Sequence, residues 1–188
     1  MACIKFIREC FQKSLVGHDK VVLSNLRIVE ARPGYIKCIL PIAAHNLNPM
    51  GTTHGGCVMS LVDTVTWLSM ATVGLPEVWS VSTNMNCEFV RPLGREGDDL
   101  VIEGFTVQQG RRIAFTRVNF TLNGKLCGFG SHTQAVDAHQ WTHKFSADGE
   151  RAIPVEELEG ASSGHSAGAA SLHVCLVARG EPRGAVFG

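Results

Sequence analysis

The sequence predicts an α+β fold in which an antiparallel β-sheet is covered by one long helix. The first observation is an apolar stripe: residues 58, 61, 62, 65 and 68 recur at helical spacing, which predicts a helix to about residue 73. The second is a series of strand-like runs joined by short turns, of which Asn123-Gly124 is the strongest hairpin signal. Consecutive strands with tight turns are typical of an antiparallel sheet, which the long helix must cover.

The elements follow one another in a simple order. The first fifteen residues place apolar side chains at helical spacing between basic ones, which predicts a short amphipathic helix. Before the long helix we expect strands at 21–29 and 35–42, separated by a turn at 31–34. After it, the strands expected are 80–90, 100–108, 112–122 and 125–136.

The length of 188 residues fits one domain with extensions. We divide the chain into an N-terminal amphipathic helix (1–17), a central domain (18–136) and a C-terminal extension (137–188). The extension is expected to be flexible, because residues 160–171 consist of Gly, Ala and Ser apart from His165.

The charge balance excludes some function classes. The 17 basic and 17 acidic residues give a formal net charge of +0, which argues against nucleic acid as the main partner. No apolar run approaches the ~20 residues of a membrane span. The 7 Cys residues form no CxxC pair, so we expect no metal and reduced thiols in the cytoplasm or the mitochondrion.

The segment His54-Gly55-Gly56 precedes the long helix. Glycines let the backbone approach a ligand closely, and the first helical turn offers unpaired N–H groups with a partial positive charge. Such a turn suits an oxyanion or a polarised carbonyl. A plain glycine turn before a helix is the alternative interpretation.

Asp63 lies on the long helix nearly opposite the apolar stripe, and it shares its face with Met59, Trp67 and Met70. The helix is therefore apolar on both sides, as if its second face packed on another body such as a partner subunit. A carboxylate among such neighbours is partly desolvated and becomes a better base near neutral pH. An ordinary helix Asp with a hydrogen-bond partner is the alternative.

Residues 46–56, followed by Leu61-Val62-Asp63, resemble the signature of hotdog-fold acyl-CoA thioesterases of the phenylacetate-degradation type, within the thioesterase superfamily. The similarity continues through 81–86, 91–92, 110–116 and 131–133 and covers roughly residues 20–136. The resemblance implies the hotdog fold, an antiparallel sheet wrapped around one central helix. It also implies a homodimer or homotetramer with active sites at the interface, and a role in lipid metabolism.

The resemblance also implies roles for individual residues. The backbone N–H of Gly55 and the side chain of Asn48 would polarise the thioester carbonyl, while Asp63 activates water that Ser82 helps to hold. The substrate-binding residues implied are His54 and Gly56 for the loop, Arg91, Arg111, Arg112, Ser131 and His132 for the phosphates of coenzyme A, and Trp67 and Met59 for the acyl group. Solvated turn charges and core packing are the alternatives for the last two groups.

The function expected is hydrolysis of acyl-CoA to a free acid and coenzyme A, with no cofactor beyond the coenzyme A of the substrate. A hotdog-type hydratase would typically carry His five positions after the helical Asp, where this chain has Leu68. The other alternative is a non-catalytic acyl-CoA-binding or partner-interaction module. The sequence leaves open the acyl chain length and whether Asp63 acts as base or nucleophile.

Overall fold

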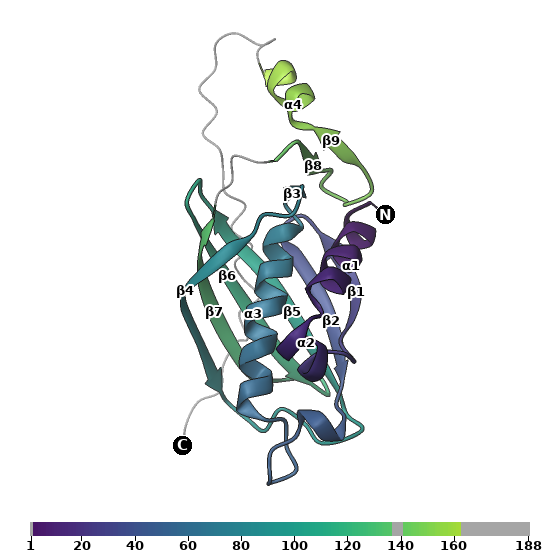
Figure 1. Cartoon of the computed structure of the whole chain (residues 1–188), viewed down its shortest axis with the longest axis vertical. Coiled ribbons are helices and arrows are strands. Elements are labelled where there is room, and N and C mark those ends of the chain that lie inside the picture. Colours follow the sequence, from purple (N-terminus) through teal and green to yellow (C-terminus); the bar gives the residue numbers. More distant parts are fainter. Residues whose placement is uncertain (1, 137–140, 163–188) are drawn as a thin grey trace, which may run out of the picture.

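The computed structural model describes residues 2–136 and 141–162 of the chain. Its main sheet has six strands in the order β1-β2-β5-β6-β7-β4, and each neighbouring pair is antiparallel (Figure 1). In chain order the strands are β1 (Arg27–Arg32), β2 (Tyr35–Pro41), β4 (Ser80–Phe89), β5 (Asp99–Gln109), β6 (Ile113–Leu122) and β7 (Lys125–Val136). The turn at Asn123 and Gly124 joins β6 to β7, as the sequence predicts, with both residues at positive φ.

The long helix α3 (Gly55–Ala71) lies along one face of this sheet, with α1 (Ala2–Ser14) and α2 (Gly17–Val22) beside it (Figure 1). A short 3-10 helix, η1 (Ala44–Asn46), precedes α3. The predicted hotdog fold, a sheet wrapped around one central helix, is confirmed. The helix starts at Gly55, three residues before the apolar stripe, because Gly55 and Gly56 belong to its first turn.

Two glycines bring α3 close to the sheet. A Cβ atom at Gly104 of β5 would lie 2.9 Å from a methyl carbon of Val65, and one at Gly130 of β7 would lie 3.2 Å from a methyl carbon of Val62. Side chains at either position would push the helix outward. The stripe residues of α3 are fully buried against the sheet. The two glycines therefore fix the distance between α3 and the sheet, and with it the position of the opposite face of α3, which carries Asp63.

Strand β4 forms one edge of the sheet. Among the described residues it pairs only with β7, and most of its ten residues are exposed. Val81 is 71% exposed and Phe89 is 53% exposed. A long edge whose backbone groups have no partner strand is a template for pairing with another strand.

The structure corrects one predicted element. The strand expected at 21–29 is wrong over its first half, where α2 continues to Val22 and β1 begins only at Arg27. The apolar run there is too short to distinguish a helix from a strand by its period. A contact distant in sequence holds α2 instead, because the ring of His18 lies 2.8 Å from the hydroxyl of Ser60 on α3.

Part of the C-terminal extension has regular structure. Strand β8 (His143–Phe145) pairs with both β9 (Ala152–Pro154) and β3 (Gly74–Leu75), and α4 (Val155–Ser162) follows. The small-residue composition of 160–171 gave no indication of this second sheet. Residues 137–140 and 163–188 lie outside the described residues, and the two boundaries between the three segments stay predictions.

No helix in the described part of the chain combines the length and apolarity that crossing a bilayer requires.

Candidate active site

A cleft of about 190 Å³ opens between α3, the start of β4 and the α1–α2 region. Its lining residues are Ser14, Asp19, Asp63, Thr64, Trp67, Trp79, Ser80 and Ser82. The structure therefore brings together three of the predicted site residues, Asp63, Ser82 and Trp67. Sequence reasoning missed Asp19, which is adjacent to them only in space, and Trp79 and Ser80, which lie just before Ser82 in the chain.

Asp63 stands out on α3. It is the one residue between Leu61 and Ala71 that is not buried, and 55% of its side chain is exposed. The expected desolvation of this carboxylate is therefore not provided by its own chain. Asp63 is thus an exposed carboxylate on an otherwise buried stretch of helix.

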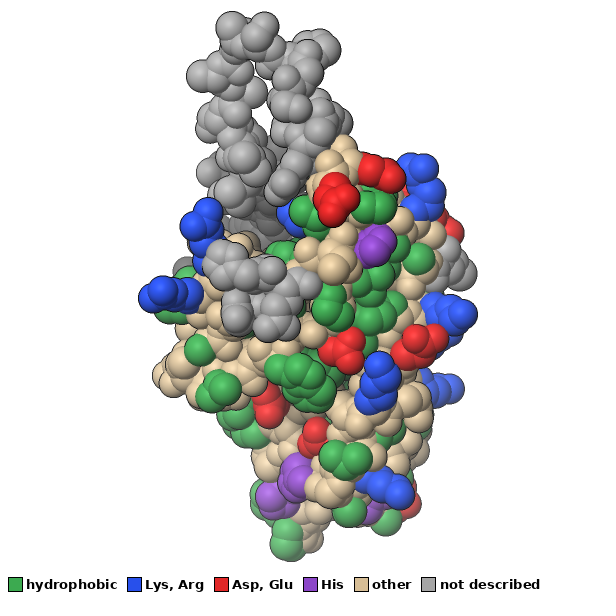
Figure 2. Space-filling model, turned by 45° about the horizontal axis from the view of Figure 1, so that its top comes forward, with side chains coloured by type: hydrophobic (Ala, Val, Ile, Leu, Met, Phe, Trp, Pro, Cys, Tyr) green, Lys and Arg blue, Asp and Glu red, His purple; other side chains and the backbone are tan. Residues whose placement is uncertain are grey.

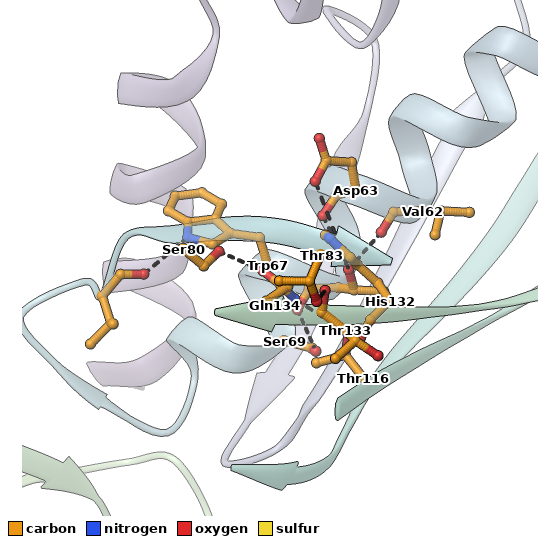
Figure 3. Close-up of polar contacts among 12 residues, drawn as sticks. Val62, Asp63, Trp67, Ser69, Ser80, Thr83, Thr116, His132, Thr133 and Gln134 are labelled. Carbon is orange, nitrogen blue, oxygen red and sulfur yellow. Dashed lines mark hydrogen bonds and ion pairs between the residues drawn. The ribbon is translucent and has the colours of Figure 1, made fainter. Parts of the chain in front are cut away.

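Ser82 reaches the cleft through an irregularity of its strand. The pairing between β4 and β7 shifts register between Ser82 and Asn84, so that Thr83 has no direct partner in the ladder. A β-bulge re-aims the neighbouring side chains and is common beside active sites. Thr83 is held in place by a hydrogen bond from its hydroxyl to the carbonyl of Thr133 (Figure 3).

An aromatic pair forms one wall of the cleft. The rings of Trp67 and Trp79 are stacked, with centroids 5.4 Å apart and an interplanar angle of 23°. Trp67 is buried and donates its indole N–H to the carbonyl of Val78, whereas Trp79 is 68% exposed. Trp67 thus combines core packing with a place in the cleft. Met59 is half-buried, packs against the core and does not line the cleft.

His132 lies directly behind Asp63 (Figure 3). It is 1% exposed, its Nδ1 is 3.8 Å from Asp63 Oδ1, and burial lowers its pKa while the charge of Asp63 partly opposes that shift. The predicted contact of His132 with a coenzyme A phosphate does not fit this position. Successive residues of a strand face opposite sides of the sheet, so Ser131 and His132 cannot reach one phosphate together. Ser131 instead accepts a hydrogen bond from Asn86.

A buried polar network continues from His132 across the sheet (Figure 3). Gln134 is fully buried, accepts a hydrogen bond from Ser80 at 2.6 Å and donates to Thr116 at 3.3 Å. The hydroxyl of Thr116 in turn donates to the carbonyl of His132. The alternation along β7 could have located this network, because Gly130, His132 and Gln134 share the face toward α3.

The first turn of α3 is capped by the side chain of His54. Its Nδ1 accepts a hydrogen bond from the backbone N–H of Gly56 at 2.8 Å, and a Cβ atom at Gly56 would lie 2.9 Å from that same nitrogen. Gly56 thus allows the cap. At Gly55 the nearest atom to an added Cβ would be Cζ of Phe89, at 3.8 Å. The N–H of Gly55 belongs to the first turn, where amides have no acceptor within the helix.

Asn48 holds the loop that leads to this turn. Its side-chain oxygen accepts hydrogen bonds from the backbone N–H groups of Met50 and Thr52, and its amide donates to the hydroxyl of Thr52. The backbone N–H of His54 donates to the carbonyl of Asn46 at 2.7 Å, which closes the loop onto α3. An Asn side-chain amide carries two hydrogens, so one is left for a substrate carbonyl.

Gly55 and Asp63 are not brought together within one chain. They are eight residues apart on a straight helix, which separates them by about 12 Å along its axis at 1.5 Å per residue. A single thioester carbonyl cannot contact both. Within one chain, the predicted pairing of oxyanion donor and base is therefore not formed.

The three predicted phosphate-binding arginines are also separated. Arg91 lies two residues after the end of β4 and donates to the carbonyl of Leu126. Arg111 and Arg112 lie in the β5–β6 connection, and the carbonyl of Arg112 accepts from Val136, which pairs with the first residue of β4. All three arginines are exposed. On the face shown in Figure 2, charges of both signs are scattered among hydrophobic side chains without a continuous basic patch.

Comparisons with known proteins agree with this architecture. The family model of the thioesterase superfamily matches residues 50–127. Human acyl-coenzyme A thioesterase 13 is 34% identical over 117 residues, which are 60% of this chain and 81% of that protein. The chain belongs to the thioesterase superfamily and is a thioester hydrolase.

Solved structures show the same fold. The crystal structure of zebra fish thioesterase superfamily member 2 superposes with a TM-score of 0.65 at 29% identity, and the match covers 71% of this chain and 97% of that chain. A thioesterase protein of Streptococcus pneumoniae, solved with coenzyme A, has a TM-score of 0.54 at 25% identity over 60% of this chain and 86% of that chain.

Proposed function

We propose that this protein hydrolyses acyl-CoA thioesters to a free acid and coenzyme A, in sites shared by two copies of the chain. The observation that carries the proposal is the exposed carboxylate of Asp63 in a cleft with Ser82 and Trp67, on a helix that is otherwise buried there. The similarity to an acyl-coenzyme A thioesterase and to a structure solved with coenzyme A supports the substrate class.

The edge strand β4 supports the sharing of sites. Asp63 shares its cleft with Ser80 and Ser82, at the start of β4, whereas Gly55 lies next to Phe89, at its end. If two copies pair their β4 edges antiparallel about a two-fold axis, the end of one β4 lies beside the start of the other. This arrangement would place Gly55 of one copy near Asp63 of its partner, cover the exposed face of Asp63 and bury the exposed Val81 and Phe89 of the edge strand.

The same pairing also gathers the arginines. Arg91 lies just beyond the end of β4, and Arg112 lies beside its start. These positions are about 30 Å apart in one chain, at 3.3 Å per strand residue, but adjacent across a two-fold pairing. Arg91 from one copy and Arg111 and Arg112 from the other would then provide a common binding surface for the phosphates of coenzyme A.

The chemistry follows from this geometry. Asp63 takes a proton from water, and the water oxygen forms a bond with the carbonyl carbon of the thioester. The carbonyl oxygen becomes an oxyanion, which the N–H of Gly55 and the amide of Asn48 stabilise. When the C–S bond breaks, the thiolate of coenzyme A accepts the proton that Asp63 holds. Ser82 holds the water in the position from which its oxygen attacks the carbonyl carbon.

The test is turnover of an acyl-CoA panel, followed by trapping of the released thiol with a dye. We expect hydrolysis by the wild-type protein. In Asp63→Asn we expect turnover to slow by about two orders of magnitude or more, as for the loss of a catalytic base, with nearly unchanged acyl-CoA binding. The matched control is Asp19→Asn, a carboxylate in the same cleft with no assigned role in the reaction. Tight acyl-CoA binding without any turnover would instead support the non-catalytic binding module.

A further inference from the structure

A histidine with an unused nitrogen is buried behind the proposed base (Figure 3). His132 is 1% exposed, and its Nδ1 lies 2.8 Å from the hydroxyl oxygen of Thr66 and 3.8 Å from Oδ1 of Asp63. Its Nε2 has no hydrogen-bond partner within the described part of the chain. An unpartnered buried nitrogen lowers stability, and an apolar side chain would avoid that loss. Packing alone therefore does not account for a histidine here.

The bonds of Thr66 assign the hydrogen on this ring. The Thr66 hydroxyl oxygen lies 2.7 Å from the carbonyl oxygen of Val62 and 3.1 Å from that of Asp63, both of which can only accept. A hydroxyl has one hydrogen, so it donates to the backbone and presents a lone pair to His132. The network therefore places the ring hydrogen on Nδ1, the nitrogen that faces both Thr66 and the carboxylate of Asp63.

We propose that His132 is a positioning residue for the reaction: its single Nδ1–H, shared between the Thr66 hydroxyl and one oxygen of the Asp63 carboxylate, orients that carboxylate and leaves its other oxygen free for the attacking water. The proposal rests on the proposed function above. The side chain of Asp63 is 55% exposed, and its Oδ1 at 3.8 Å lies within about 1 Å of hydrogen-bond distance from Nδ1. Burial of the ring keeps His132 neutral, so it acts as a dipole fixed by Thr66 and not as a second charge.

Three substitutions separate this role from a structural one. In His132→Asn the side-chain amide nitrogen takes the place of Nδ1, in His132→Gln it takes the place of Nε2, and His132→Leu has no donor. We expect kcat to fall about 10- to 100-fold in His132→Leu and His132→Gln, with KM nearly unchanged, because a misplaced reacting group loses rate without losing binding. We expect His132→Asn to retain kcat within about threefold.

The decisive comparison repeats these substitutions in an Asp63→Asn protein. If His132 acts through Asp63, His132→Leu has no further effect on kcat there, so the two changes are strongly non-additive. Melting temperatures of all variants check that each protein is folded.

Equal fractional losses of kcat with and without Asp63, or rescue by Gln instead of Asn, would overturn the positioning role. A failure of the proposed function is distinguishable, because Asp63→Asn alone would then leave turnover unchanged.

Discussion

The imidazole of His54 accepts a hydrogen bond from the backbone N–H of Gly56 at 2.8 Å, and this contact caps the helix that carries the proposed base. An added methyl group at Gly56 would displace the ring, whereas one at Gly55 would meet only Phe89 at 3.8 Å. Since the two glycines are neighbours at the helix start, Gly55→Ala is a matched control for Gly56→Ala. We expect Gly56→Ala to be less stable than Gly55→Ala by about 1 kcal/mol, the usual worth of an N-cap.

Chemical denaturation of the two variants measures this difference. Equal free energies of unfolding would show that the His54 cap contributes nothing to α3.

The N–H of Gly55 can be removed without disturbing the helix start. Proline is favoured at the first helical position, and His54 has the extended conformation (φ −66°, ψ 135°) that a residue before proline requires. Gly55→Pro therefore loses one hydrogen-bond donor, while Gly55→Ala keeps it. We expect turnover by Gly55→Pro to slow by about 100- to 1,000-fold, the loss typical of one oxyanion donor, and turnover by Gly55→Ala to slow far less.

Steady-state kinetics with one acyl-CoA suffices for this comparison. Similar kcat values for the proline and alanine variants would exclude the N–H of Gly55 as an oxyanion donor.

Isotope labelling distinguishes a base from a nucleophile. If Asp63 activates water, a single turnover in ¹⁸O-water puts the label directly into the product acid. If Asp63 attacks the thioester, the thiolate leaves and a mixed anhydride forms; hydrolysis of that anhydride at the Asp63 carbon gives unlabelled acid and puts the label into the protein. We expect labelled acid in the first turnover, measured by mass spectrometry of acid and protein after mixing with excess enzyme.

Burial of His132 predicts a pH dependence of stability. Burial lowers its pKa below the usual 6.5, and the facing carboxylate of Asp63 only partly opposes this shift. Below pH 6.5 the unfolded chain therefore binds more protons than the folded one, so the free energy of unfolding decreases as the pH falls. Above pH 6.5 the ring is neutral in both states, so the folded protein keeps its full stability with respect to His132.

The comparison is urea denaturation between about pH 8 and pH 5 for the wild-type protein and for His132→Asn, which has no titrating group at this position. We expect a smaller loss of stability in the variant. Identical pH profiles would contradict the burial of a neutral ring.

Local patterns predicted much of the fold. The stripe of α3, the Asn123-Gly124 hairpin and the alternation of β6 and β7 are short-range signals, and each corresponds to an observed element. Contacts between distant segments were not predictable in this way. The bond between His18 and Ser60 holds α2, and Gly74 pairs with Lys144 in a strand of the extension. The hydrophobic periodicity of a segment carries no information about such contacts.

In the candidate site, too, some features follow from local sequence patterns and others depend on contacts between distant segments. Asp63 was identified from its position on the helix, and its exposure is a property of the folded chain. The inward direction of His132 follows from strand alternation, but its place behind Asp63 depends on how α3 crosses β7. Trp79, Asp19 and the bulge at Ser82 follow from the packing of β4 and α2 against α3, which sequence patterns do not specify.

The central claim, that two chains build each site, is tested most directly by complementation. Asp63→Asn and Gly55→Pro proteins are mixed, dissociated and reassembled, and their activity is compared with that of each protein alone. In a mixed dimer one site has both defects and the other has neither. Random pairing of equal amounts therefore predicts recovery of about a quarter of wild-type activity. Activity that stays at the level of the separate variants, in a sample shown by light scattering to contain dimers, would contradict the shared site.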